Sequence, residues 1–313
     1  MPDESTCVIY NPAAGRGRAR KQIDETRKFL APHAELMPTE GPGHGVEVAR
    51  NAVANGYRRI IAAGGDGTVH EVANGILNAN EPDAVLSVWP LGSMNDYAFT
   101  LGLLEWWKLP ARPPLDRMRV DVGTATADDR TEWFVNSAGI GFNGMVTIES
   151  RKIRWLRGIP LYAWGLLKAM VKHFAAPSLS ISVGETHIDG PTLAFGLYLG
   201  QREGGFPLGK EARLDDGLFD TFHVADVRRW ELIRYLPGLI TGNLPHDHPK
   251  LRRGRGAIVD VAGTVPLCCH LDGEFLCRPE EGVRRAQFAI VPNRLTVECY
   301  RPGLYGRRPS DAT

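Results

Sequence analysis

Apolar and polar residues follow two different periods in the first third of the chain, and these periods predict strands followed by helices. Short β-rich runs occur at residues 7–10, 58–63 and 84–90, and helical patterns occur at residues 20–30 and 46–55. A further helix is predicted after residue 68 because apolar side chains recur there at helical spacing. Its apolar positions are Val69, Val72, Ala73, Ile76 and Leu77. Strands that alternate with helices predict βαβ units and a mostly parallel sheet.

Beyond residue 120 the pattern changes to short β-like runs separated by turn residues. The runs begin with VDVGTA and EWFVNSAG and end with FAIV and RLTVECY. Such spacing is typical of an antiparallel sandwich. Helical patterns interrupt it at residues 161–176 and 227–240.

The change of pattern predicts an α/β protein with two domains. We expect an α/β nucleotide-binding domain at residues 1–122, rejoined by the C-terminal segment 295–313. Residues 123–294 are expected to form a β-rich sandwich domain.

Composition and charge narrow the class of protein. The 313 residues carry a net charge of +1, so no overall positive field favours a nucleic acid as partner. Five cysteines without a CxxC pair favour reduced thiols over a disulfide framework or a thiolate zinc site. The N-terminus has no signal-like apolar segment, and no stretch has the roughly 18 apolar residues of a membrane-spanning helix. We therefore expect a cytoplasmic protein that contacts a membrane at most from one side.

The run AAGGDGTVHEVANG at residues 62–75 joins a predicted strand to a predicted helix through closely spaced glycines. Glycine is required where φ is positive or where a ligand would meet a Cβ atom, and free N–H groups at a helix start bind phosphate. Asp66 would repel a phosphate unless a cation such as Mg²⁺ lies between them. An ordinary tight turn is the alternative interpretation.

Two more loops follow predicted strands of the same sheet, NPAAG at residues 11–15 and PLGSMND at residues 90–96. Loops that follow parallel strands open on one edge of the sheet, where ligands bind in open α/β folds. The sequence has no GxxxxGK[ST] motif, which excludes a P-loop NTPase.

The motifs NPAAG, GGDGTVHEVANGI, PLGSMNDYAFTLG, VDVG, NSAGIGF, RLDDGL and LDGE occur in this order between about residues 7 and 300. In this combination the chain resembles the bacterial members of the diacylglycerol kinase and sphingosine kinase superfamily. The resemblance implies an ATP-dependent lipid kinase that uses Mg²⁺. It also implies an N-terminal nucleotide domain, a β-rich C-terminal domain and a site in the cleft between them.

The resemblance assigns roles to individual positions. The nucleotide-contacting set that it implies is Asn11, Pro12, Ala13, Ala14, Gly15, Thr39, Gly64, Gly65, Asp66, Gly67, Thr68, Val69, His70, Glu71, Ser93 and Asn95. Acids around the catalytic Mg²⁺ are Asp66, Asp96 and Asp121. A second, structural metal site would take the carboxylate of Asp216 and the backbone carbonyls of Arg213 and Leu218. The family pattern is altered at residues 209–213, which leaves the occupancy of that second site open.

Asp272 and Glu274 of the LDGE motif are the candidates for general-base chemistry. The resemblance implies that Glu274 accepts the proton of the acceptor hydroxyl. In an extended strand, residues two apart face the same side, so we expect both carboxylates to lie together. Which of the two is the base stays open, and the alternative is a surface turn with Gly273 at its tip.

Two other functions share some of these features. An NAD kinase shares GGDG, but LGSMNDYA in the third loop disfavours it. A non-catalytic nucleotide or lipid sensor would have no need for a base. The acceptor stays open between diacylglycerol, a long-chain amino alcohol and a polyprenol-like or glycolipid alcohol, and a homodimer is one option for the assembly.

A lipid kinase must meet a membrane surface, and residues 149–158 are one candidate for that contact. The segment carries Trp155 and the cations Arg151, Lys152, Arg154 and Arg157. An apolar stripe follows it, formed by Ala163, Leu166, Leu167, Met170, Val171 and Phe174. Such a stripe is typical of an interfacial helix or of a helix packed on a core. The basic run 250–255 and the pair Trp106–Trp107 are further candidates.

Overall fold

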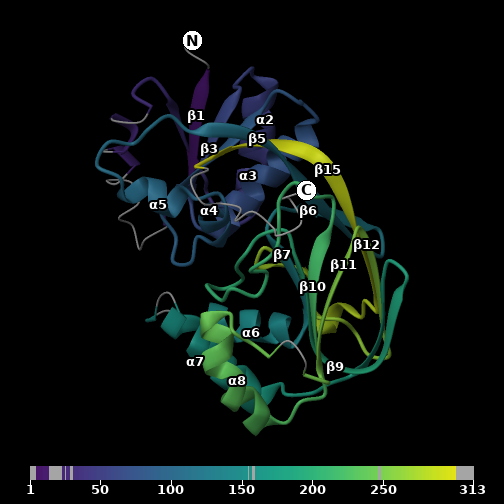
Figure 1. The fold of residues 1–313 in the computed structure, drawn as a ribbon. Helices are drawn as coiled ribbons and strands as arrows, with labels where there is room; N and C mark the ends of the chain where they lie inside the picture. The colour runs from purple at the N-terminus through teal and green to yellow at the C-terminus, as the bar shows by residue number, and fades with distance from the viewer. Residues whose placement is uncertain are drawn as a thin grey trace, which may run out of the picture. The chain divides into compact units, whose positions relative to one another are not determined.

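The computed structural model describes residues 5–13, 23–24, 26–28, 31–153, 155–156, 159–245 and 248–300. The chain forms two compact units (Figure 1). Unit 1 comprises Met1–Val120 with Asn293–Thr313, and unit 2 comprises Asp121–Pro292. Two long strands, β5 (Asp116–Ala127) and β15 (Arg285–Cys299), run through both units.

Unit 1 is built on a parallel sheet with helices, as the alternating pattern predicted. Its other strands are β1 (Thr6–Tyr10), β2 (Glu35–Pro38), β3 (Arg59–Gly64) and β4 (Val85–Pro90). They lie in the order β2–β1–β3–β4–β15, and every neighbouring pair is parallel. The helices are α2 (His44–Ala54), α3 (Asp66–Ala79), α4 (Asp96–Thr100) and α5 (Leu103–Lys108). The helix expected at residues 20–30 lies for the most part outside the described residues.

Helix α3 buries the apolar face that its sequence period predicted. Val69, Val72 and Ile76 are each no more than 3% exposed. The C-terminal half of β15 is held in this sheet by a buried acid, since Glu298 accepts two hydrogen bonds from Arg59 at 2.8 and 2.7 Å. The C-terminal half of β15 is thus part of the first unit.

Unit 2 is an antiparallel sandwich, so the predicted α/β class with a β-rich second part is confirmed. Its strands besides β5 and β15 are β6 (Arg130–Phe134), β7 (Ser137–Gly141), β8 (Ser178–Val183), β9 (Thr186–Tyr198), β10 (Phe219–Ala225), β11 (Leu251–Gly256), β12 (Ile258–Gly263), β13 (Cys269–Leu271) and β14 (Glu274–Cys277). One sheet has the order β6–β5–β15–β12–β8–β9, and the other has the order β14–β13–β7–β9–β10–β11.

Strand β9 belongs to both sheets of the sandwich. Its first half pairs with β8, and its second half pairs with β7 and β10. Aromatic side chains fill the interior: the ring of Phe134 stacks on Phe219 at 5.6 Å and meets the edge of Phe288 at 6.3 Å between centroids. These contacts join β6, β10 and β15.

Three helices of unit 2 lie together in Figure 1, namely α6 (Phe142–Arg151), α7 (Ile159–Lys172) and α8 (Arg229–Thr241). Helices α7 and α8 match the two predicted helical segments. Helix α6 was not predicted because its sequence, FNGMVTIESR, combines a glycine with β-branched residues and has low helix propensity.

Two boundaries between strands also differ from the prediction. The run EWFVNSAG forms two strands, β6 and β7, rather than one. The segments FAIV and RLTVECY form the single strand β15, in which Asn293 has a positive φ of 51°.

Glu149 is the buried acid that ties α6 to α7. Its side chain is 1% exposed and pairs with Lys152 at 2.8 Å, His173 at 3.3 Å and Lys172 at 3.6 Å. The hydrogen bond from Lys152 is the main reason why the pKa of Glu149 falls from 4.5 to about 2, although burial acts in the opposite direction. Ionised Glu149 therefore stabilises the folded state.

We predict that Glu149→Gln lowers the free energy of unfolding at neutral pH by roughly 1 to 3 kcal/mol, because the charged hydrogen bonds are lost. The folded pKa lies below the unfolded one, so this stabilisation is complete above pH 4.5 and is lost as the pH falls towards 2. Urea denaturation across this range should show that the difference in free energy of unfolding between wild type and variant shrinks as the pH falls. The control is Glu105→Gln, which removes an exposed pair with Lys108. A gap of constant size would contradict the prediction.

Candidate functional site

The carboxyl ends of four parallel strands bring the predicted loops of unit 1 to one sheet edge. The loops follow Tyr10, Pro38, Gly64 and Pro90, the last residues of β1 to β4. Two backbone hydrogen bonds continue this edge: Thr39 donates to Tyr10 O at 2.8 Å, and Leu91 donates to Gly64 O at 2.9 Å. The residues chosen from three separate motifs are therefore neighbours in unit 1.

Contact between two loops explains the glycines of the GGDGT motif. Gly65 has an extended backbone with φ −96° and ψ −172°, so a positive φ is not the reason for glycine there. A Cβ atom on Gly92 would overlap the Cα atom of Gly65, and a Cβ on Gly64 would overlap the side chain of Thr68. The sequence alone had explained these glycines by a positive φ or by a ligand against the backbone. It did not indicate that the loop at Gly65 packs against the loop at Gly92.

Asp66 joins the same two loops through hydrogen bonds. Its Oδ2 atom accepts the Asn95 N–H at 2.9 Å, and its Oδ1 atom accepts the Tyr97 N–H at 3.4 Å. Asn95 has a positive φ of 54°, and its side chain accepts the Gly92 N–H at 2.9 Å. Asp96, which is 5% exposed, lies between the two residues that donate to Asp66. Two of the three acids of the predicted magnesium site, Asp66 and Asp96, thus lie at the starts of α3 and α4, which these hydrogen bonds hold together.

The carboxylates of unit 1 fit Mg²⁺ only as partners of a phosphate-bearing ligand. Among the residues that the structure describes, no group of three or more His, Cys, Asp and Glu side chains could cage a metal ion. Mg²⁺ in phosphoryl-transfer sites is commonly held by one or two carboxylates with substrate phosphates and water. Asp66 suits that arrangement because it is the first residue of α3, and the N-terminus of a helix favours a phosphate.

Several members of the predicted nucleotide set have structural contacts of their own. The side chains of Val69 and His70 are buried in α3. Glu71 accepts the N–H groups of Gly43 and Gly45, both at 2.8 Å, and so fixes the start of α2. All three side chains therefore have packing or hydrogen-bonding roles within unit 1. Asn11 accepts the Ala13 N–H at 2.9 Å in the loop after β1, while Ala14 and Gly15 lie outside the described residues.

Asp121 belongs to unit 2 and is bound to the RLDDGL loop. It is 1% exposed, its carboxylate accepts the Gly217 N–H at 2.6 Å, and its own N–H donates to Leu214 O at 2.6 Å. The resemblance had assigned this acid to the catalytic Mg²⁺ and the loop to a second metal. In the structure, Asp121 and the RLDDGL loop are instead bound to each other.

A guanidinium group pairs with Asp216, the carboxylate expected at the second metal site. Arg255 pairs with Asp216 and, at 3.2 Å, with Asp220. The other residues implied for this site, Arg213 and Leu218, contact Asp215 and Asp216 through their own N–H groups. The Asp216 carboxylate thus already has a cation of the chain itself as its partner.

The LDGE motif forms a tight hairpin rather than a continuous strand. Strands β13 and β14 pair through Leu271 and Glu274, and the turn residues Asp272 and Gly273 have positive φ values of 52° and 90°. The expectation that Asp272 and Glu274 share one face of an extended strand is therefore wrong. The two acids lie at different positions of the turn and have different partners.

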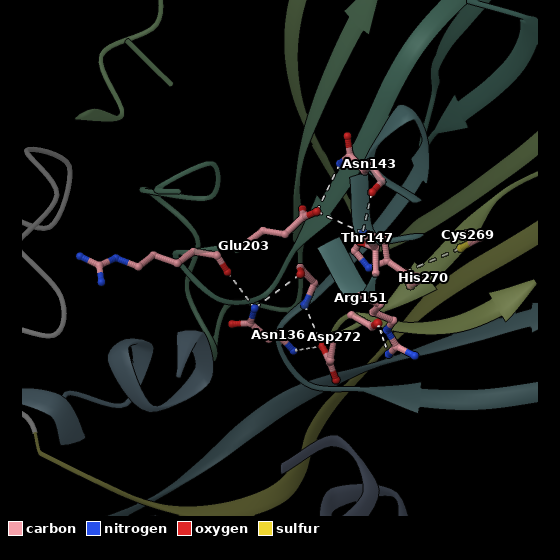
Figure 2. Close-up of polar contacts among 11 residues, drawn as sticks. Asn136, Asn143, Thr147, Arg151, Glu203, Cys269, His270 and Asp272 are labelled. Carbon is pink, nitrogen blue, oxygen red and sulfur yellow. Dashed lines mark hydrogen bonds and ion pairs between the residues drawn. The ribbon is translucent and has the colours of Figure 1, made fainter. Parts of the chain in front are cut away.

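Asp272 is fully engaged by backbone donors (Figure 2). Its Oδ1 accepts the N–H groups of Asn136 at 2.8 Å and Ser137 at 2.9 Å, and its Oδ2 accepts the Val135 N–H at 3.0 Å. These bonds hold the break between β6 and β7, which explains why the predicted single strand is two. Asp272 is thus a structural anchor of the hairpin.

Glu274 pairs with a side chain instead. Its Oε1 lies 2.6 Å from Nη2 of Arg151, and the Glu274 side chain is 36% exposed. Arg151 also donates to Gly273 O at 2.7 Å and lies over the ring of Phe275. The sequence had named Arg151 among the cations of a candidate membrane contact, and the structure gives it Glu274 as a partner. Glu274 is a solvent-accessible carboxylate in a fixed position.

A buried Glu203–His270 pair lies beside this hairpin and was not predicted. His270, which is 1% exposed, lies 3.1 Å from Oε1 of Glu203, and Asn143 donates to the same oxygen at 3.5 Å (Figure 2). A Cβ atom on Gly139 would overlap the imidazole ring. The only sequence signal was the position of His270 two residues before Asp272 and of Gly139 within NSAGIGF.

Comparisons with known proteins agree with the two-part architecture. Residues 5–118 match the model of the diacylglycerol kinase catalytic domain, and residues 136–299 match that of the YegS C-terminal NAD kinase beta sandwich-like domain. A Chromohalobacter salexigens protein named "Probable lipid kinase YegS-like" is 33% identical over 280 residues, which cover 87% of each chain. The protein belongs to the YegS-like lipid kinase family.

Further relatives extend the match over nearly the whole chain. A Xanthomonas euvesicatoria protein of the same name is 33% identical over 305 residues, or 93% of this chain and 94% of the relative. The crystal structure of a diacylglycerol kinase from Bacillus anthracis superposes with a TM-score of 0.69 over 96% of this chain and 98% of that chain, at 19% identity. That likeness concerns the fold.

The contact between Gly65 and Gly92 yields a stability prediction. Gly92→Ala should lower the free energy of unfolding by roughly 1 to 3 kcal/mol, because its Cβ overpacks the backbone of the glycine loop. The matched control is Gly41→Ala, whose Cβ would meet no atom within 4 Å. Chemical denaturation of both variants compares the two positions. Equal stability of Gly92→Ala and wild type would refute this account of the motif.

Arg255 yields a second prediction. Arg255→Ala leaves Asp216 and Asp220 without their shared cation and should lower the melting temperature. Added Ca²⁺ or Mg²⁺ should restore part of the loss in this variant and leave the wild type unchanged, because the wild type already holds a guanidinium there. Arg252→Ala on the same strand serves as the control. Equal stabilisation of wild type and variant by the cations would show that the loop binds a metal beside Arg255.

Proposed function

We propose that this lipid kinase transfers the γ-phosphoryl group of ATP to the hydroxyl group of a lipid alcohol such as diacylglycerol, with the help of Mg²⁺. The observation that carries the proposal is the Asp66 link between the glycine loop and the start of α4, on the edge where the parallel strands end. Unit 1 supplies the nucleotide side of the reaction. Unit 2 supplies a carboxylate for the acceptor.

The start of α3 suits the phosphate chain of ATP. Gly67 and Thr68 lie in the first turn of α3, and within the described part of the chain their N–H groups have no backbone acceptor. Free N–H groups and the helix dipole at this position favour an anion. When bound, Mg²⁺ would neutralise charge on the phosphates, and Asp66 and Asp96 are the acids that would hold it, directly or through water.

Glu274 is the residue best suited to accept the proton. In the transfer step the acceptor oxygen bonds to the γ-phosphorus, the bond from that phosphorus to the β,γ-bridging oxygen breaks, and ADP leaves with the bond electrons. The hydroxyl proton passes to the Glu274 carboxylate. General-base assistance of this kind contributes on the order of 10² to 10⁴ in rate. Asp272 positions the hairpin, since backbone donors already occupy both of its oxygens.

Membrane contact follows from the proposed substrate. A diacylglycerol-like acceptor resides in a bilayer, so the kinase has to meet it at the surface. Among the described residues, no helix has the length and apolar character to cross a bilayer. Contact from one side is therefore the form of membrane association that we propose.

The experiment that tests the function is incubation with labelled ATP and a total lipid extract, followed by identification of the labelled product. We predict that Glu274→Gln reduces transfer by roughly 10² to 10⁴ while the fold and the affinity for ATP stay unchanged, because only the base is removed. Glu280→Gln, an exposed acid beyond the same hairpin, is the matched control. Full activity of Glu274→Gln would remove this residue from the mechanism, and absence of any labelled lipid would remove the function.

A further inference from the structure

Exposed apolar side chains gather on α7, α8 and the segment before α7. Nine large apolar side chains of the described residues are classed as exposed, and seven of them lie in these places. The seven are Trp155, Trp164, Leu167, Val171, Trp230, Ile233 and Ile240. Apolar patches that folding leaves uncovered on one face mark interaction surfaces. We refer to these seven residues as the outer face.

The outer face is separate from the part of each helix that the fold uses. Leu166 and Met170 of α7 and Leu232, Leu236 and Leu239 of α8 pack in one apolar cluster with residues of α6 and β9. The stripe expected from the sequence is therefore divided. Its residues 166 and 170 are buried, whereas 167 and 171 are 41% and 75% exposed. Each helix is apolar on a second side that has no role in the core.

The two helices share one local sequence pattern. Residues 164–168 read WGLLK, and residues 230–234 read WELIR. In both, a tryptophan is followed by an exposed apolar residue three positions later and by a cation four positions later. Residues at these spacings lie on the same face of a helix. Lys168 and Arg234 therefore flank the exposed tryptophans.

Positive charge predominates on α7 and α8. Helices α7 and α8 contain four cations and one acid, Glu231. That acid accepts the Arg228 N–H at 2.6 Å and pairs with Lys250 at 3.1 Å, so it is already neutralised. Among the described residues Lys168 and Arg234 have no acidic partner. A second copy of the same face would bring these cations against each other, whereas anionic headgroups would complement them.

From these observations we infer that α7 and α8 together form an interfacial docking surface for a bilayer that contains anionic phospholipid. Tryptophans with adjacent cations are typical of the depth at which headgroups meet acyl chains. The helices, of 14 and 13 residues, are long enough to lie in that layer and too short to cross it. This inference rests on the proposed lipid acceptor, and it assigns the surface through which the kinase reaches the bilayer.

Vesicle flotation of the full chain, without nucleotide, tests the docking surface apart from catalysis. The probes are vesicles of phosphatidylcholine alone and of phosphatidylcholine with phosphatidylglycerol. Wild type should float with the mixed vesicles, and added salt should weaken the binding. Trp164→Ser/Ile233→Ser should lower the partition coefficient by roughly tenfold or more, because apolar area no longer leaves water.

Matched controls come from the remaining exposed apolar residues of unit 2. Ile258 on β12 is 54% exposed, like Ile233, and Val265 is 43% exposed, like Trp164. Ile258→Ser/Val265→Ser should bind vesicles as wild type does. For the charges, Lys168→Gln/Arg234→Gln should abolish the preference for phosphatidylglycerol, whereas Lys210→Gln/Arg285→Gln, with the same change in net charge, should keep it.

Several outcomes would overturn the inference. One such outcome is that the wild-type protein floats with neither kind of vesicle. Another is that the control Ile258→Ser/Val265→Ser loses as much vesicle binding as Trp164→Ser/Ile233→Ser does. A third is a dimer in sedimentation that Trp164→Ser/Ile233→Ser dissociates, since the face would then cover a second copy. An assay of phosphoryl transfer to lipid dispersed in detergent separates the proposed docking surface from the proposed kinase function. Docking can fail while transfer persists, and a docked protein that phosphorylates no lipid would refute the function alone.

Discussion

Hydrogen bonds from backbone N–H groups of distant segments to carboxylates are the interaction on which the candidate site residues of each unit depend. Asp66 holds the start of α4, Glu71 holds the start of α2, and Asp272 holds the break between β6 and β7. Hydrogen bonds to an ionised acceptor are stronger than neutral ones, and they satisfy donors that a loop would otherwise leave unpaired. The acids of the sequence motifs therefore serve first to connect segments of the chain through hydrogen bonds.

This constraint separates the acids that build the site from the acid that is available for chemistry. Asp272 and Asp121 are bound to backbone donors in unit 2, and Asp216 is bound to Arg255. Glu274 differs because its partner is the Arg151 side chain and more than a third of its own side chain is exposed. A carboxylate in a fixed position that still reaches solvent can exchange a proton with a substrate, whereas the oxygens of Asp272 are already occupied by three N–H donors.

The helices of unit 2 show a second division between structure and function. A helix that packs on a core needs one apolar stripe, and α7 and α8 have such stripes in Leu166 and Leu236. The tryptophans on their other sides, Trp164 and Trp230, stay 43% and 56% exposed. A lipid kinase that binds its acceptor at a bilayer would have a use for such side chains, since they stabilise the bound state rather than the fold.

Local patterns in the sequence determined the elements, and long-range contacts decided what the residues in them do. The period of Val69, Val72 and Ile76 determined α3, because burying one face of a helix needs only local spacing. The motif order determined the family and the set of loops at the sheet edge, since parallel strands end on the same side. By contrast, the turn at Asp272 depends on donors more than a hundred residues earlier in the chain, and Arg151 meets Glu274 across 122 intervening residues. Only the tertiary structure decides such pairs, because the energy of a charge depends on which group faces it and on how far both are removed from water.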